Sequence, residues 1–289
     1  MGAGEAVATP SAAARFEVWG DPIDHSLSPR LHSAAYAELG LPWEYGRRQV
    51  DEASFARALR TNGAEARGLS LTFPLKTEAH RAAESLDRSA TLTGAVNTLV
   101  PGSVLRGFNT DVDGLAADLR QHGVRDISAA RIVGAGATGT SALLALAACG
   151  ATDVEVRARR LAAASPLVEL GDRIGVAVRT APLDAPPGQA VAAVPVTVST
   201  LPGGAELTDG VARVLAESGG LLYDVVYGHW PTELAAAWLE TERPAVNGLG
   251  MLLQQALRQI RIFSTGDPDA PLPREDAVVD VMRLALVGD

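Results

Sequence analysis

A single lysine stands in the stretch SLTFPLKTE, residues 70–78, where it could take part in proton transfer. The 25 lysine and arginine residues of the chain comprise 24 arginines and this one lysine, Lys76. A guanidinium stays protonated, whereas an ammonium near other charged groups can exchange its proton. If Lys76 lies beside Asp111, the pair can donate a proton to a carbonyl oxygen and keep the charge balanced. The alternative is an ordinary surface lysine on a helix. A GC-biased genome explains only why lysine is rare.

Small polar residues gather at expected strand ends and helix starts in the first part of the chain. Ser26 and Ser28 come just before Pro29, so their hydroxyls and a helix N-terminus could bind a carboxylate. Helix capping is the alternative, and it accounts for one serine more easily than for both. Thr72 and Asn97, like Lys76 and Asp111, lie where expected strands end or expected helices begin. We therefore expect a cleft lined by these groups.

A glycine-rich loop in the middle of the chain predicts a nucleotide site. Gly134, Gly136 and Gly139 form G-x-G-x-x-G directly after an apolar strand and at the opening of a helix. The first glycine makes the tight turn, the second lets the backbone approach a pyrophosphate, and the third lets helix and strand pack closely. The free N–H groups of the helix N-terminus supply positive potential.

The end of the next strand indicates which dinucleotide is bound. An acid at this end reads the ribose 2′-hydroxyl of NAD. Here Glu155 falls within the strand, and the end carries Arg157, Arg159 and Arg160. Guanidinium groups pair strongly with phosphate, so the pattern favours the 2′-phosphate of NADP. A solvated basic turn is the alternative.

Alternating strands and helices must position these groups. Strand-like runs at 16–20, 43–50 and 67–73 alternate with helix-like runs at 28–40, 52–61 and 74–86, the last with Pro74 in its first turn. Residues 95–101 and 104–109 read as a hairpin. From 111 onward, helices alternate with strands at 130–136, 153–159, 196–200 and 221–227, which predicts a parallel sheet covered on both faces. Two amphipathic helices, 250–263 and 274–286, end the chain.

Composition limits the class of protein and its partners. A chain of 289 residues with 47% hydrophobic and 20% charged residues predicts a folded protein of two domains. The net charge of −9 disfavours nucleic acid and anionic membranes, so small molecules are the expected partners. No window reaches the ~18–20 apolar residues of a membrane span. The one cysteine, Cys149, lies in an apolar run and is expected to be a packed thiol. A single cysteine cannot form an intramolecular disulfide, which predicts a reducing, cytoplasmic compartment. We expect no metal site.

The motifs together resemble the shikimate dehydrogenase family, which reduces 3-dehydroshikimate with NADPH. The resemblance runs from about residue 19 to residue 266 and rests on SLSP, SLTFPLK, GAVNTL, NTDVDG, GAGATG, VSTLPGG, DVVYGHWPTEL and NGLGMLLQQA. It implies an α/β fold with a discontinuous substrate domain, residues 15–112 and 249–289, and a Rossmann-type NADP-binding domain, residues 113–248. Residues 1–14 are expected to form a flexible tail. A monomer or a homodimer is expected.

The resemblance also implies roles for individual residues. Lys76 and Asp111 would form the catalytic pair. The substrate would contact Ser26, Ser28, Ser70, Thr72, Asn97, Tyr227 and Gln255. NADP(H) would contact Gly134, Gly136, Ala137, Thr138, Gly139, Arg157, Arg159, Arg160, Ser199, Thr200, Val225, Gly248, Gly250 and Met251.

Some positions depart from the family pattern. Ser70 stands where the family usually has a substrate-binding Asn, and Ser199 stands where a cofactor-cradling Asn is usual. Arg160 replaces a common Thr, and His229-Trp230 enlarges the segment after Tyr227. Because ring-hydroxyl contacts distinguish substrates, a quinate or aminoshikimate dehydrogenase is the alternative within the family.

Two alternatives lie outside the family. A non-catalytic nucleotide-binding regulator could share the fold, although retention of Lys76 and Asp111 argues against it. A methylene-tetrahydrofolate dehydrogenase-like enzyme shares the two-domain plan and an essential lysine, but SLSP and NTDVDG do not belong to its pattern.

Overall fold

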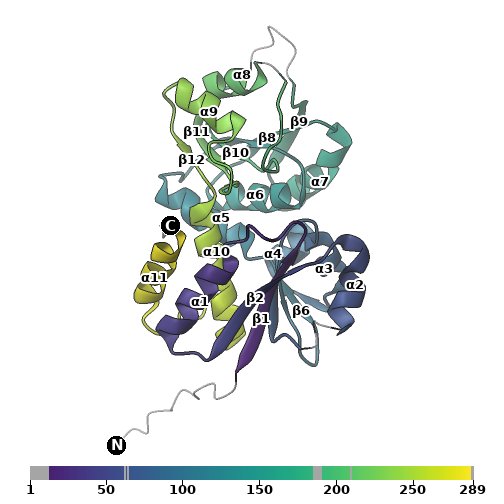
Figure 1. Cartoon of the computed structure of the whole chain (residues 1–289). Coiled ribbons are helices and arrows are strands. Elements are labelled where there is room, and N and C mark those ends of the chain that lie inside the picture. Colours follow the sequence, from purple (N-terminus) through teal and green to yellow (C-terminus); the bar gives the residue numbers. More distant parts are fainter. Residues whose placement is uncertain (1–12, 62, 64, 185–190, 209, 288–289) are drawn as a thin grey trace, which may run out of the picture.

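The computed structural model describes residues 13–61, 63, 65–184, 191–208 and 210–287, and these form two β-sheets flanked by helices (Figure 1). The strand order is β2-β1-β3-β5-β6-β4 in the first sheet and β12-β11-β10-β7-β8-β9 in the second. The predicted α/β class is confirmed. Residues 1–12 of the predicted tail lie outside the described residues, and Ala14 already belongs to the first strand.

The first sheet is mixed and carries helices on both faces. Its strands are β1 (Ala14–Gly20), β2 (Trp43–Gln49), β3 (Gly68–Leu71), β4 (Ser85–Leu86), β5 (Thr98–Val100) and β6 (Arg106–Phe108). Strands β2, β1 and β3 are parallel, and β5 runs antiparallel to β3 and β6, which confirms the predicted hairpin. One face packs against α1 (Ser28–Leu39), α10 (Leu249–Thr265) and α11 (Glu275–Val287). The other packs against α2 (Glu52–Thr61), α3 (Lys76–Ala82) and α4 (Arg88–Thr93).

The second sheet is parallel throughout. Its strands are β7 (Ala129–Val133), β8 (Asp153–Ala158), β9 (Ala177–Pro182), β10 (Val194–Ser199), β11 (Gly219–Asp224) and β12 (Ala245–Val246). One face packs against α5 (Asp111–Gln121), α6 (Ala137–Ala148) and α7 (Ser165–Ile174), which follows the 3-10 helix η1 (Leu161–Ala164). The other packs against α8 (Val211–Ser218) and α9 (Glu233–Glu240). Burial on both faces explains the near-continuous apolar strands.

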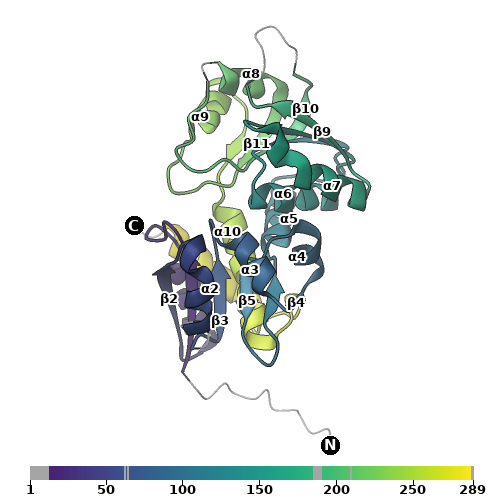
Figure 2. The same cartoon turned by 90° about the vertical axis from the view of Figure 1, so that its right-hand side faces the viewer.

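Two helices join the sheets. Helix α5 follows the first sheet in the chain and packs into the core of the second through Leu115 and Leu119. Helix α10 does the reverse: Met251 at its start belongs to the second core, and Ile260 belongs to the first. The two helices pack against each other, and Figures 1 and 2 show α10 running between the two halves. Of the helices in the described ranges, none has both the length and the apolar character of a membrane span.

Among the predicted elements whose bounds differ from the structure, two have a clear local cause. The helix predicted over 74–86 covers only Lys76–Ala82, because the Leu75 N–H donates to the Thr72 carbonyl over 2.8 Å and closes a turn first. Residues 85–86 instead pair with β6 as strand β4. The strand predicted over 221–227 ends at Asp224, since the N–H of Val226 donates to the Asp224 side chain over 3.1 Å and turns the chain.

Candidate active site

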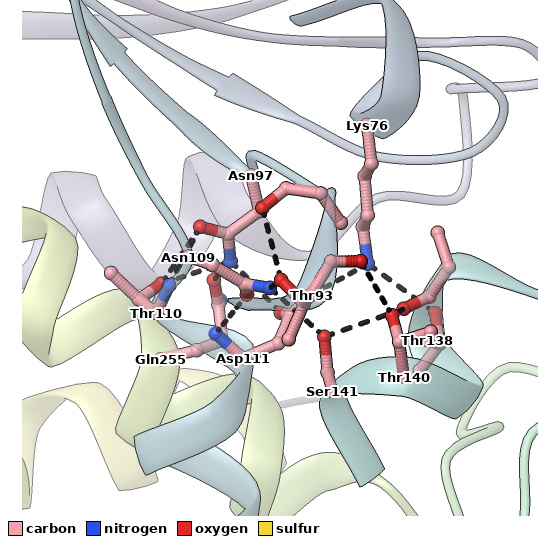
Figure 3. A network of polar contacts seen from close by, with 12 residues as sticks. Lys76, Thr93, Asn97, Asn109, Thr110, Asp111, Thr138, Thr140, Ser141 and Gln255 are labelled. Carbon is pink, nitrogen blue, oxygen red and sulfur yellow. Dashed lines mark hydrogen bonds and ion pairs between the residues drawn. The ribbon is translucent and has the colours of Figure 1, made fainter. Parts of the chain in front are cut away.

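Lys76 and Asp111 meet between the two halves of the molecule. Each is the first residue of a helix, α3 and α5 respectively, so the two helix starts bring the side chains together. Lys76 Nζ lies 2.6 Å from Asp111 Oδ2, and the side chains are only 14% and 7% exposed (Figure 3). Position at an N-terminus favours the aspartate's negative charge. The geometry is that of a charge-assisted hydrogen bond shielded from bulk water.

The second oxygen of Asp111 is held by Asn97. Asn97 Nδ2 donates to Asp111 Oδ1 over 2.9 Å and to Thr110 Oγ1 over 2.9 Å. It also lies 3.4 Å from Gln255 Oε1, on α10. The structure thus brings together four of the residues that the sequence assigned to catalysis and substrate binding: Lys76, Asn97, Asp111 and Gln255 (Figure 3).

The serines lie at the start of α1. Ser28 begins the helix and is buried, and its N–H donates to Ser26 Oγ over 3.4 Å. Between them, the backbone of Leu27 hydrogen-bonds to the phenol of Tyr227, which comes from the other half of the molecule. Burial, which outweighs this bond, raises the pKa of Tyr227. The contact brings Tyr227 to the two serines, as the sequence predicts.

Two other predicted substrate residues lie on β3 and just after it. The N–H of Thr72 donates to the carbonyl of Trp19 over 3.0 Å, which anchors the turn before Lys76 to β1. Ser70 is 3% exposed, and its hydroxyl accepts from Tyr45 Oη over 2.6 Å and donates to Gln259 Oε1 over 2.8 Å. Its proton is therefore used within the protein, and one lone pair remains for the predicted substrate contact.

The glycine loop has the geometry of a phosphate cradle. Gly134 has φ +111°, and a methyl group there would lie 2.5 Å from Thr200 Oγ1. Gly136 precedes α6, and no described atom lies within 4 Å of a methyl group placed on it. The backbone can therefore approach a ligand closely at the helix N-terminus. The hydroxyl of Thr138, in the first turn of α6, lies 3.4 Å from Lys76 Nζ, so this loop faces Lys76 and Asp111.

The three arginines after the loop separate into two groups. Arg157 is buried, donates to Glu155 Oε1 over 2.7 Å and to the Pro182 carbonyl over 3.2 Å, and so points into the sheet face. Glu155 sits two residues earlier on the same face of β8 and pairs with Arg157, so these contacts do not support the predicted contact with the 2′-phosphate. Arg159 and Arg160 follow the strand and are exposed.

The predicted nicotinamide side forms at the carboxyl ends of β10 and β11. The N–H of Val225 donates to the carbonyl of Ser199 over 3.0 Å. A methyl group on Gly248 would lie 2.1 Å from the Val225 carbonyl, so this glycine is needed for close approach of two segments. The Met251 N–H donates to Tyr223 Oη over 3.1 Å. These contacts bring the start of α10 beside both strand ends.

Several polar contacts where the two halves meet involve residues that the sequence did not single out. Asn109 Nδ2 donates to Thr93 Oγ1 over 2.8 Å and to Ser141 Oγ over 3.0 Å, and Thr140 Oγ1 donates to the Thr93 carbonyl over 3.1 Å (Figure 3). Asn109 opens the NTDVDG stretch, which was the only available signal. The described residues hold no group of three or more His, Cys, Asp or Glu placed to bind a metal ion.

Comparisons with known proteins agree with this geometry. Residues 18–99 match the family model described as the shikimate dehydrogenase substrate binding domain. A shikimate dehydrogenase (NADP(+)) from Bordetella avium is 34% identical, and the match covers 95% of this chain and 97% of that protein. A pentafunctional AROM polypeptide from Yarrowia lipolytica is 34% identical over 91% of this chain, which spans 18% of that longer protein.

Solved structures give the same result. The structure of Mycobacterium tuberculosis shikimate dehydrogenase is 39% identical, with a TM-score of 0.81 over 94% of this chain and 99% of that one. A Thermus thermophilus shikimate 5-dehydrogenase, solved in complex with NADP(H) and shikimate, is 28% identical, with a TM-score of 0.77 over 94% and 99% of the two chains. The chain therefore belongs to the shikimate dehydrogenase family.

Proposed function

We propose that the protein is an NADP-dependent shikimate dehydrogenase, which interconverts 3-dehydroshikimate and shikimate. One observation carries the proposal: Lys76 Nζ lies 2.6 Å from Asp111 Oδ2 and 3.4 Å from Thr138 Oγ1 of the glycine loop. A proton-donating pair thus faces the place where a dinucleotide's phosphates would be held. The relative from Bordetella avium and the Thermus thermophilus structure carry names that match this activity.

The residues of the second half fit a dinucleotide. The open space over Gly136 and the free N–H groups at the start of α6 suit a pyrophosphate. Exposed Arg159 and Arg160 suit a 2′-phosphate. When bound, NADPH supplies a hydride to the substrate's carbonyl carbon.

The side chains of this protein then supply binding and the proton. Ser26, Ser28 and Tyr227 bind the substrate carboxylate, and Thr72, Asn97 and Gln255 bind the ring hydroxyls. Lys76 donates a proton to the carbonyl oxygen, so that the ketone becomes a CH–OH group. Asp111 keeps its negative charge beside the lysine and balances the charge through the step. In the reverse direction, Lys76 accepts the hydroxyl proton.

One assay tests the substrate and the cofactor together. Purified protein is incubated with shikimate, quinate or aminoshikimate, each with NADP or NAD, and nicotinamide absorbance is followed. We expect turnover of shikimate with NADP to exceed every other combination. No turnover in any combination contradicts the enzyme proposal and favours a nucleotide-binding regulator. Preference for quinate with NAD contradicts both the substrate and the cofactor. A cytoplasmic location and a monomeric or homodimeric state are further expectations.

A further inference from the structure

The buried amide of Gln259 links the catalytic pair to the interior of the first sheet. Gln259 follows Gln255 by one turn of α10 and is 1% exposed. Its Nε2 lies 3.2 Å from the backbone oxygen of Asn97 and 3.0 Å from Thr98 Oγ1. Its Oε1 lies 2.8 Å from Ser70 Oγ. One side chain of α10 thus connects β3 to β5 next to the active site.

The hydrogen bonds between Gln259 and the active site have one consistent direction. A backbone N–H can only donate, so the Asn97 atom 2.9 Å from the Thr110 N–H is Oδ1. Asn97 Nδ2 therefore faces the Asp111 carboxylate. Because Asn97 Oδ1 carries no hydrogen, Thr98 donates its hydroxyl proton to it over 2.8 Å. Thr98 Oγ1 is then free to accept from Gln259 Nε2.

The same direction continues on the far side of Gln259. With Nε2 donating, Oε1 accepts from Ser70 Oγ and from His32 Nε2, the latter over 3.3 Å. His32 Nδ1 is then an acceptor for the Tyr36 hydroxyl at 3.1 Å. Burial lowers the pKa of His32 to about 3, against the hydrogen bond to Gln259, so the ring is neutral in the folded protein. Tyr45 donates to Ser70 over 2.6 Å.

These bonds form one ordered network that ends on the Asp111 carboxylate, where Lys76 meets it from the other side. Within this network, Gln259 accepts hydrogen bonds on one side through Oε1 and donates on the other side through Nε2. An amide is required there, because an acceptor must face Ser70 and His32 while a donor faces β5. Buried networks of this kind hold a unique geometry only when every member is satisfied.

We propose that Gln259 is a positioning residue that fixes Asn97 and Thr98 so that the Asn97 amide holds Asp111 against Lys76. It acts through these neighbours rather than on the substrate. The first test of this inference measures turnover and so rests on the proposed shikimate dehydrogenase activity. The second test measures a lysine resonance and does not need that activity.

The first experiment compares Gln259→Met and Gln259→Glu with Gln254→Met and Gln254→Glu, a matched pair on the partly exposed side of α10. For Gln259→Met we expect kcat to fall about 10- to 100-fold, the scale expected for a misplaced reacting group, while the KM for NADPH stays within about twofold. A buried glutamic acid keeps one donor while protonated. We therefore expect the kcat of Gln259→Glu to be close to that of the parent at pH 6, where the acid is protonated, and about tenfold lower than that of the parent at pH 9. The Gln254 variants should match the parent throughout.

The second experiment needs no turnover. Because Lys76 is the only lysine of the 289 residues, protein labelled with ¹³C at the lysine ε-carbon gives one lysine resonance. We expect this resonance to move in Gln259→Met toward its position in Asp111→Asn, and to stay in place in Gln254→Met. An unmoved resonance together with normal kcat, whatever the melting temperature, overturns the inference. If Gln259→Met does not fold, the inference is overturned instead when the ratio of the kcat of Gln259→Glu to that of the parent is the same at pH 6 and pH 9. An inactive parent refutes the proposed function, while the resonance still tests Gln259.

Discussion

Replacing Lys76 with arginine separates the charge of this side chain from its ability to exchange a proton. A guanidinium keeps the positive charge beside Asp111 and can hydrogen-bond to both of its oxygens. It stays protonated under assay conditions, so it cannot deliver the proton that the carbonyl oxygen needs. We expect Lys76→Arg to fold normally and to lose turnover.

The structure sets the size of both effects. With Nζ and Oδ2 2.6 Å apart, two unit charges attract by ~6 kcal/mol at an effective dielectric constant of ~20. Arginine retains most of this attraction, so the free energy of unfolding should change by less than about 1 kcal/mol. Loss of general acid–base catalysis costs ~10²–10⁴ in kcat, or ~3–5 kcal/mol in the barrier. Lys76→Met removes the charge as well and should cost a further ~3–5 kcal/mol of stability, because Asp111 stays buried without its partner.

The assay follows NADPH absorbance with 3-dehydroshikimate under saturating conditions, and urea denaturation gives the stability of each variant. We expect kcat to fall to a similar extent in the arginine and methionine variants, and stability to fall in the methionine variant alone. If Lys76→Arg keeps kcat within about threefold of the parent, Lys76 supplies charge only, and the proton comes from another group.

Three further predictions concern the cofactor loop and the first sheet. Gly134→Ala should abolish NADPH binding, measured by titration of the fluorescence of the reduced nicotinamide, because its methyl group would lie 2.5 Å from Thr200 Oγ1 at a φ of +111°; tight binding would contradict the cradle. Arg159→Gln should raise the KM for NADPH ~10-fold or more and leave that for NADH unchanged, and equal effects would refute a role at the 2′-phosphate. Burial raises the pKa of Glu17, but hydrogen bonds from Arg48 and Trp19 outweigh this, and the pKa is lowered overall. The stability that Glu17 contributes is therefore present above its unfolded pKa and lost as pH falls through the folded one. Glu17→Gln should destabilise the protein at pH 7 by ~1–3 kcal/mol, and this difference should shrink as the pH falls through the lowered pKa of Glu17.

The sequence predicted the meeting of Lys76 and Asp111 because each stands at a helix start that follows a strand of the same sheet. Lys76 follows β3 and Asp111 follows β6. These two strands run parallel with β5 between them, so both helix starts lie at the same edge of the sheet. Local rules do not reveal the ion pair of Arg157. Strand periodicity puts Arg157 on the same face of the strand as Glu155. Whether that face is covered by another segment depends on tertiary packing, which the local sequence does not give. In the structure this face is covered, and Arg157 is buried in an ion pair with Glu155.

Gln259 shows a second limit. Nothing near it in sequence distinguishes it from Gln254, and its importance comes from Ser70, 189 residues away in the chain. The protein contacts of Ser70 could not be foreseen for the same reason, because its partners Tyr45 and Gln259 come from elements that are distant in the sequence.

The place where the chain crosses between the two sheets has a mechanical consequence. Asp111 begins α5 and Gln255 lies in α10, and these are the two helices that join the halves. If one half rotated relative to the other about these two helices, displacements would be small beside them and would grow with distance. Ligands could then enter and leave where the two halves separate most, while Asp111 and Gln255 would move little.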